Sequence, residues 1–397
     1  MNNSLTQQQL EMQALARDFG DKHIKPVAME IDQIANPQKA FPVGLMTKGL
    51  DAGFQSMCIP KAYGGLGLDC LTHALMFEEF GAADIGFALS FQAHNLALAL
   101  LLNSGTEEQR ALFLKPIVEG GLAAVASVEP NTPSAATLLD PKNFTWDTHA
   151  VREGDDWIIN GQKVFGSNAG TSLCKWILIS ARTDKNQVGM SANSLFLIWA
   201  DTPGITVGDN YDKMGHRMAY TPTIDLKNVR VSHSQLLGGK SMALSGERPP
   251  RLTTADNYLN VAAQSVGLAR AIYGEALAFA QTRVTNGKPM AEHQAVALKL
   301  ANMYIEIEAA RALLWKVACM SDSQPQIDRK LPIATKVFCT DMVANISRDG
   351  LQIFGGRGYR KDMLIEKLYR DAKAPEIYEG ANDSLRITLA QLINWGL

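Results

Sequence analysis

The chain contains 397 residues, of which 46% are hydrophobic and 20% charged, and its formal net charge is −2 at pH 7. This composition excludes a largely disordered chain, and the length favours two or three domains. The small net charge excludes the basic surface that collects nucleic acid, and the sequence has no polybasic run that would hold an anionic membrane. We therefore expect small molecules or other proteins as partners.

Residues 5–120 repeat apolar side chains at helical spacing and are predicted to be mostly helix. The N-terminus lacks the patterns of signal and transit peptides, so we expect a cytoplasmic protein. The longest apolar stretch, residues 87–102, is interrupted by Gln92, His94 and Asn95. It is also shorter than the roughly 20 residues that cross a bilayer, which indicates a buried core helix. Thr106 and Gln109 have the spacing of a capping box at the start of another helix.

Residues 122–237 change to short β-rich runs separated by turn residues. No helical segment alternates with these runs, so a doubly wound parallel sheet is excluded and a separate β domain is predicted. The predicted strands are residues 123–128, 149–154, 156–165, 176–181, 194–200, 205–208 and 223–226.

After Arg251 the pattern returns to long helical segments, predicted at residues 252–283, 291–321, 331–354 and 379–394. The fold class is therefore α+β, with a helical domain at 1–121, a β domain at 122–240 and a helical bundle at 241–397. A proline-rich, charged stretch at residues 246–253 is the predicted joint before the bundle.

Several common site motifs are incomplete in this chain. Residues 234–241 (SQLLGGKS) lack the first glycine of a phosphate-binding loop, and no GxG pair has the third glycine of a dinucleotide-binding turn. The sequence contains no GxSxG or HExxH motif, and its five cysteines are scattered without metal-ligand spacing. Hydrolase, metalloprotease and metal-site interpretations are therefore excluded.

Several separate stretches agree in order and spacing with one family, and the chain resembles the acyl-CoA dehydrogenases along nearly its whole length. The resemblance implies the family's three-domain fold, with a C-terminal four-helix bundle, and a homotetramer or at least a dimer. The stretches are IPKAYGGLGLD from Ile59, VEP from Val128, NGQKVFGSNAG from Asn160, KMGHR from Lys213, NVRV from Asn228, RVTNGKPMAEHQ from Arg283, QIFGGRGY from Gln352 and YRDAKAPEIYEG from Tyr369.

The same resemblance implies FAD, bound without a dinucleotide-binding fold between the β domain and the bundle. Phe165 would stack on the flavin ring and Ser167 would hydrogen-bond its edge, roles that their aromatic face and hydroxyl permit. By residues alone Phe165 would more often be core, and the glycines after Gln352 would more often be a simple helix cap. The remaining cofactor positions implied by the family are Val128, Ser134 and Ala381, with Arg283, Gln294, Gln352, Gly355 and Gly356 reaching the flavin of another subunit.

The run DAKAPEIYEGAND from Asp371 holds the predicted catalytic base, Glu379, in the family's YEG motif. In the family's reaction this carboxylate removes the α-proton of an acyl-CoA thioester while the β-hydride passes to flavin N5, and electrons continue to an electron-transferring flavoprotein. Gly380 would allow the tight backbone that binds the thioester carbonyl, and the other substrate positions are Ser134 and Tyr258. The neighbouring acids are assigned other roles: Glu376 and Asp383 a surface position, and Asp371 a hydrogen bond or salt bridge that orders the turn.

Four departures from the family's pattern surround the cofactor. The flavin loop reads VEPNTPSAA from Val128, Tyr258 replaces a common arginine, the usual FGK is NGK from Asn286, and Ala381 replaces a threonine that Asn382 could stand in for. Asp256 is a rival base near Tyr258. Two alternatives stay open: a carrier-protein-linked desaturase, an oxidase or a reductase on the same fold, or an FAD-free member that acts as a subunit or scaffold.

Overall fold

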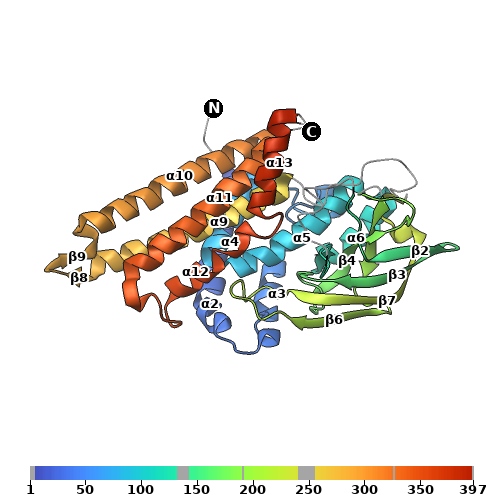
Figure 1. Ribbon diagram of the computed structural model, residues 1–397, viewed down its shortest axis with the longest axis horizontal. Helices are drawn as coiled ribbons and strands as arrows, with labels where there is room; N and C mark the ends of the chain where they lie inside the picture. Colours follow the sequence, from blue (N-terminus) through green and yellow to red (C-terminus); the bar gives the residue numbers. More distant parts are fainter. Residues whose placement is uncertain (1–4, 132–142, 190–191, 240–254, 325–326, 396–397) are drawn as a thin grey trace.

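The computed structural model describes residues 5–131, 143–189, 192–239, 255–324 and 327–395. Long helices lie side by side at one end of the molecule and a β sheet lies at the other, with the N-terminal helices packed against both (Figure 1). Seven strands form this sheet, and the predicted α+β arrangement of helices, then strands, then helices is confirmed.

The N-terminal helices bring the chain from the bundle to the sheet. The helix at residues 87–102 is confirmed as a buried one, α5, and Thr106 caps α6 through the predicted box with Gln109. Among the described helices α5 alone is long and apolar enough to cross a bilayer, but 83% of its most apolar window is buried, as in a core helix. The helices are α1 (Gln7–Phe19), α2 (Lys25–Asp32), α3 (Val43–Asp51), α4 (Cys70–Ala83), α5 (Ile85–Ser104) and α6 (Glu107–Val118).

All seven predicted strands are present, in the order β1-β4-β2-β3-β7-β6 with β5 paired to β4. Most pairs of the described strands are antiparallel, and among them only β1 and β2 run parallel to β4, so the sheet is not doubly wound. In β7 buried and more exposed residues largely alternate, which fits a sheet with one face on the core. The strands are β1 (Leu122–Ala126), β2 (His149–Glu153), β3 (Asp156–Lys163), β4 (Cys174–Arg182), β5 (Asn193–Trp199), β6 (Ile205–Asn210) and β7 (Pro222–Ser232).

The C-terminal bundle contains α9 (Ala255–Thr282), α10 (Gln294–Ser323), α11 (Lys330–Phe354) and α13 (Asn382–Trp395). The prediction that the last helix begins at residue 379 is wrong by three residues, because Glu379 and Gly380 have φ angles of 55° and 96°, which a right-handed helix cannot contain. The short helix α12 (Leu364–Asp371) was not predicted. A hairpin of β8 (Val284–Thr285) and β9 (Lys288–Pro289) turns through Asn286 and Gly287, both at positive φ.

One hydrophobic cluster joins the N-terminal helices to the bundle. The backbones of α4 and α9 touch, because a Cβ added at Gly267 would lie 1.9 Å from the Glu78 carbonyl oxygen and one at Gly81 would lie 2.2 Å from that of Gln264. The two helical segments therefore share a core, although they are far apart in the sequence. Division of the chain at residues 121 and 240 stays a prediction, and the proposed joint at 246–253 lies outside the described residues.

Candidate active site

Glu379 lies in the turn that leads into α13, with a half-buried side chain and a φ of 55°. A left-handed backbone is unfavourable for a residue with a Cβ, so it persists only where the surroundings impose it. Gly380, the next residue, has a φ of 96° and takes this conformation without that cost. Gly380 therefore permits this turn, which sets the direction of the Glu379 carboxylate, and its role beside a thioester carbonyl stays a prediction.

A buried glutamine from α5 contacts the carboxylate. The Gln92 side-chain nitrogen donates to Glu379 Oε1 at 3.3 Å and to the Asn257 Oδ1 oxygen on α9 at 2.5 Å. Gln92 is fully buried and Asn257 is 2% exposed. The sequence did not connect these residues to the predicted base, and the signal available was Gln92, one of the few polar residues of a largely apolar helix.

Lys336, on α11, holds the backbone after the base. Its ammonium group donates to the Gly380 carbonyl oxygen at 2.9 Å and to Asn382 Oδ1 at 2.8 Å, and its side chain is completely buried. Burial lowers the pKa of Lys336 to about 8, although Glu379 and Asp341 favour the charged form. Asn382 also donates to Thr340 and Asp341, so its amide is bonded to α11, and its possible replacement of the lost threonine near the flavin stays a prediction.

Tyr378, which precedes the base, is held by the bundle and by the β domain. Gln264 Nε2 donates to its hydroxyl at 3.0 Å, and the His216 ring packs edge-on against it with centroids 5.9 Å apart. His216 in turn donates its backbone N–H to Asp371 Oδ1 at 2.6 Å. These contacts connect the motif around Lys213 with the motif around Glu379.

Asp371 anchors the segment that precedes the Glu379 turn in the chain. Lys367 donates to Asp371 and to Asp84, each at 2.6 Å, and all three side chains are at most 3% exposed. Burial opposes each charge, but the two carboxylates raise the pKa of Lys367 well above its ordinary value, and Lys367 and His216 lower that of Asp371. The predicted ordering role of Asp371 is confirmed.

The other acids stand apart from the base. Glu376 pairs with Lys373 at 2.7 Å, and Asp383, with a side chain 98% exposed, lies 3.6 Å from Arg386, so the surface role predicted for both is confirmed. Asp256 is exposed and accepts a hydrogen bond from Ser321. In the part of the chain that the structure describes, no contact joins Asp256 to Glu379 or to its turn.

On the β domain, Phe165 points its ring outward. Its side chain is 57% exposed at a φ of 59°, with Tyr211 beside it at a centroid distance of 5.1 Å. The loop is closely packed, because a Cβ on Gly166 would lie 2.5 Å from Ile224, and the Asn168 amide donates to the carbonyl oxygens of Ser90 and Ala123. The half-buried Ser167 lies between them. An exposed aromatic face next to a hydroxyl fits the ring of a flavin.

The start of the predicted flavin loop is anchored by a buried ion pair. Glu129 and Lys163 lie 2.8 Å apart with side chains 1% and 0% exposed, and the Val128 carbonyl accepts the Val164 N–H at 2.9 Å. Val128 thus contributes its backbone to the sheet. Ser134 and the altered part of this loop lie outside the described residues, so their roles stay predictions.

The second group of predicted cofactor residues lies at the end of the bundle far from the β domain (Figure 1). Arg283, Gln294 and Gln352 are exposed there, and a Cβ on Gly355 or Gly356 would meet nothing within 4 Å. Open backbone with a nearby guanidinium and amides fits a phosphate-containing group. The structure therefore separates this group from Phe165 and Ser167 within one chain.

Two predicted positions remain. Tyr258 is 7% exposed and packs in an apolar cluster with Ile333, Val337, Leu385 and Leu392 of α11 and α13. Ala381 is half-buried between Gly380 and the start of α13. Their assigned roles in substrate and cofactor binding stay predictions.

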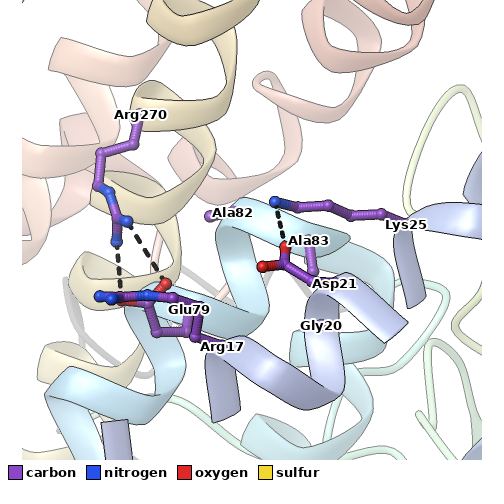
Figure 2. Close-up of a pocket in the computed structure, with 8 residues that line it drawn as sticks. All are labelled: Arg17, Gly20, Asp21, Lys25, Glu79, Ala82, Ala83 and Arg270. Carbon is purple, nitrogen blue, oxygen red and sulfur yellow. Dashed lines mark hydrogen bonds and ion pairs between the residues drawn. The ribbon is translucent and has the colours of Figure 1, made fainter. Parts of the chain in front are cut away.

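A small pocket of about 90 Å³ opens between α1, α4 and α9, away from these residues (Figure 2). Arg17 and Arg270 both reach the Glu79 carboxylate, at 2.8 and 3.2 Å, and Lys25 pairs with Asp21 at 2.7 Å. Burial would raise the pKa of Glu79, yet the two guanidinium groups hold it below its ordinary value. The charged side chains that line this pocket already pair with one another, so these ion pairs hold the helices together. The described residues contain no group of three potential metal ligands.

Known proteins place the chain in one family. It matches the family models for the acyl-CoA dehydrogenase N-terminal domain at residues 6–121, middle domain at 125–229 and C-terminal domain at 253–393. It is 34% identical to "Probable acyl-CoA dehydrogenase YngJ" of Bacillus subtilis (strain 168), covering 98% of this chain and 99% of that protein. It is also 34% identical to the 3-(aryl)acrylate reductase of Clostridium sporogenes (strain ATCC 15579), covering 97% and 98%.

The fold leads to the same family. Butyryl-CoA dehydrogenase from Megasphaera elsdenii superposes with a TM-score of 0.90 at 30% identity, covering 99% of this chain and 100% of the other. The three matched domains follow the order of helices, strands and helices in the structure. The chain belongs to the acyl-CoA dehydrogenase family, has that family's fold and is an oxidoreductase.

Proposed function

We propose that the protein catalyses the FAD-dependent α,β-dehydrogenation of an acyl thioester, most simply an acyl-CoA, with Glu379 as the base. The observation that carries this proposal is the Glu379 turn, in which a carboxylate at positive φ is contacted by Gln92 and backed by the Lys336 bond to Gly380. Such a preorganised carboxylate suits the removal of a weakly acidic α-proton.

Residues of the chain itself have separate roles in the proposed reaction. The Glu379 carboxylate takes the α-proton, and the backbone at Gly380 offers the open geometry needed beside a thioester carbonyl, whose developing negative charge a backbone N–H can stabilise. FAD, when bound, accepts the hydride that leaves the β-carbon. The buried helices α5 and α9 exclude water from the side of the base that carries Gln92 and Asn257.

Phe165 and Ser167 would hold the flavin ring, and Val128 and Ala381 would lie at its edges. Arg283, Gln294, Gln352, Gly355 and Gly356 would bind the ADP half of the cofactor of another subunit, because they are exposed at the end of the bundle remote from the β domain. We accordingly propose a homotetramer, or at least a dimer. The exposed apolar side chains Leu298, Tyr304 and Ile305 on α10 support such contacts.

Electron-transferring flavoprotein is the proposed acceptor, and the cytoplasm the proposed location. A reductase that adds hydrogen across an α,β-double bond is a second candidate, since a relative of equal identity is named 3-(aryl)acrylate reductase. The same base would serve both directions, because a group that removes the α-proton returns it in the reverse reaction.

A visible spectrum of the purified protein, followed by anaerobic addition of a panel of acyl-CoA thioesters, tests the proposal. We expect flavin bands that at least one saturated thioester bleaches. Bleaching only by a chemical reductant, with reoxidation by an enoyl thioester, would favour the reductase. Absence of flavin bands after incubation with FAD would sink the redox proposal and favour a scaffold role.

A further inference from the structure

Three buried carboxamides surround the predicted base and its neighbour Tyr378. Gln92 and Gln264 are 0% exposed and Asn257 is 2% exposed. Glutamine and asparagine are seldom this deeply buried, because a buried amide costs stability unless its oxygen and nitrogen find partners. The partners of each amide therefore indicate what the site is built to bind.

The carboxylate determines how the Gln92 amide is oriented. A carboxylate oxygen only accepts hydrogen bonds, so the Gln92 nitrogen, not its oxygen, faces Glu379 Oε1 at 3.3 Å. The same nitrogen donates to Asn257 Oδ1, which leaves the Gln92 oxygen on the opposite side of the amide. Among the residues that the structure describes, this buried oxygen has no hydrogen-bond partner.

Gln264 repeats the pattern on the second helix. Its nitrogen donates to the Tyr378 hydroxyl at 3.0 Å, while its oxygen, also buried, has no partner within the described part of the chain. Gln264 lies seven residues after Asn257 on α9, so both side chains project from the same helix face, two turns apart. Two unpaired acceptors, one from α5 and one from α9, therefore flank the turn that holds the base.

We propose that these two oxygens bind a hydrogen-bond donor on the acyl group, so that the substrate is a short acyl thioester bearing a hydroxyl or amide N–H close to its reacting carbons. This inference rests on the proposed function. The nitrogen and oxygen of one amide lie about 2.3 Å apart, so the Gln92 oxygen is no more than about 6 Å from the Glu379 oxygen that takes the proton. Only a donor within the first few carbons beyond the α-carbon can reach it.

The hydrogen-bond donor on the acyl group must be uncharged. An ammonium group at this distance would pair with the Glu379 carboxylate and oppose its action as a base. A plain alkyl chain would leave both acceptors buried and unpaired, which a site built around hydrogen bonds rejects strongly. The amides therefore distinguish between acyl groups of the same size.

The test compares the binding of two size-matched products of the proposed reaction. Calorimetry would measure the Kd values of 4-hydroxy-2-butenoyl-CoA and 2-pentenoyl-CoA, in which a methyl replaces the hydroxyl, with the oxidised full-length protein. We expect the hydroxyl compound to bind at least about tenfold more tightly. Equal Kd values, tighter binding of the alkyl compound, or no binding of either would overturn the inference.

Gln92→Met removes the amide at nearly constant volume and should reduce the Kd ratio to within about threefold. Gln109→Met is the matched control, because Gln109 is a buried glutamine on α6 that donates to the carbonyls of Ser234 and Leu236, and it should leave the ratio unchanged. A ratio that survives Gln92→Met in folded protein would contradict the role of Gln92, and the wild-type ratio decides if that variant does not fold.

Flavin reduction separates this inference from the proposed function. If the hydroxyl compound binds more tightly but neither 4-hydroxybutanoyl-CoA nor pentanoyl-CoA bleaches the flavin, the dehydrogenase proposal fails while the binding inference stands. If 4-hydroxybutanoyl-CoA and pentanoyl-CoA bleach the flavin equally and the two enoyl thioesters have equal Kd values, the dehydrogenase proposal stands and the inference fails.

Discussion

The turn around Glu379 and the far end of the bundle differ in how complete they are within one chain. Around Glu379, side chains from α5, α9 and α11 and from the loop at His216 converge and are joined by hydrogen bonds within the chain. At the far end, Arg283, Gln294, Gln352 and the two glycines lie exposed. The first region is built by its own chain, whereas the second presents groups outward.

This difference indicates which changes should act within the subunit and which between subunits. A substitution near Glu379 removes a partner from a buried network, so it should alter chemistry or stability in each chain. A substitution at the far end leaves the fold intact and should alter only what another molecule contacts there. The predictions below test this contrast from the largest expected effect to the smallest.

Glu379→Gln should lower the rate of anaerobic flavin bleaching by about 10²- to 10⁴-fold while FAD stays bound, because the amide cannot take the α-proton. Stopped-flow absorbance of the flavin band measures this rate. Glu376→Gln is the control, since Glu376 is an acid of the same segment that forms an ion pair with Lys373, and it should stay near wild type. Retained bleaching in Glu379→Gln would move the base elsewhere, with Asp256 the first residue to test.

Lys367→Met should lower the free energy of unfolding by about 3–5 kcal/mol, because Asp84 and Asp371 would be left as buried, uncompensated charges. Urea unfolding followed by circular dichroism measures the loss. Lys22→Met removes an ion pair with Asp18 whose side chains are 66% and 65% exposed, and should change stability by less than about 1 kcal/mol. Similar losses in the two variants would contradict the buried network.

Lys336→Met should change how stability depends on pH. The folded-state pKa of Lys336, about 8, is below the ordinary 10.5, so between these values the unfolded chain binds more protons and wild-type stability rises with pH through this lysine. The difference in unfolding free energy, wild type minus variant, should therefore increase by on the order of 2 kcal/mol from pH 7.5 to 10. Lys163 and Lys213, whose pKa values burial also lowers to about 8, are present in both proteins and cancel. If the difference in unfolding free energy stays constant or falls between pH 7.5 and 10, the lowered pKa of Lys336 is contradicted.

Arg283→Ala should change the free energy of unfolding by less than about 0.5 kcal/mol but raise the Kd for FAD about tenfold, because an exposed guanidinium would be lost from the proposed contact with another subunit's cofactor. Recovery of FAD fluorescence on dilution measures the affinity. Arg152→Ala, an exposed arginine that bonds the Gly154 carbonyl, should leave FAD binding unchanged. An unaltered Kd in both variants would place the cofactor contacts away from the far end of the bundle.

Much of the fold was predictable from local pattern. The seven strands follow from β-branched and aromatic runs between turn residues, and α5 follows from the longest apolar stretch of the chain. The start of α13 was predicted three residues too early, because the prediction carried the helix through Gly380, whereas Glu379 and Gly380 both have positive φ and form a turn before it. Helix α12 was missed because its eight residues give too short a window for periodicity.

The residues of the site also fall into those that the sequence predicted and those that it did not. Glu379 could be assigned from the YEG motif, and the ordering role of Asp371 from its place after Tyr369 and Arg370. Gln92, Asn257 and Lys336 lie 287, 122 and 43 residues before Glu379 in the chain, and no local signal relates them to it. Their polarity in apolar helices marks them as unusual, but not as neighbours of one another.

The sequence by itself thus determined the order of helices and strands and the family, and it supplied Glu379 as the proposed base, since each depends on short-range pattern or on a contiguous motif. Only the tertiary structure decided what surrounds that base. Buried hydrogen bonds join residues by the packing of α5, α9 and α11, and packing depends on the close approach of whole helices, such as that at Gly81 and Gly267, rather than on spacing along the chain.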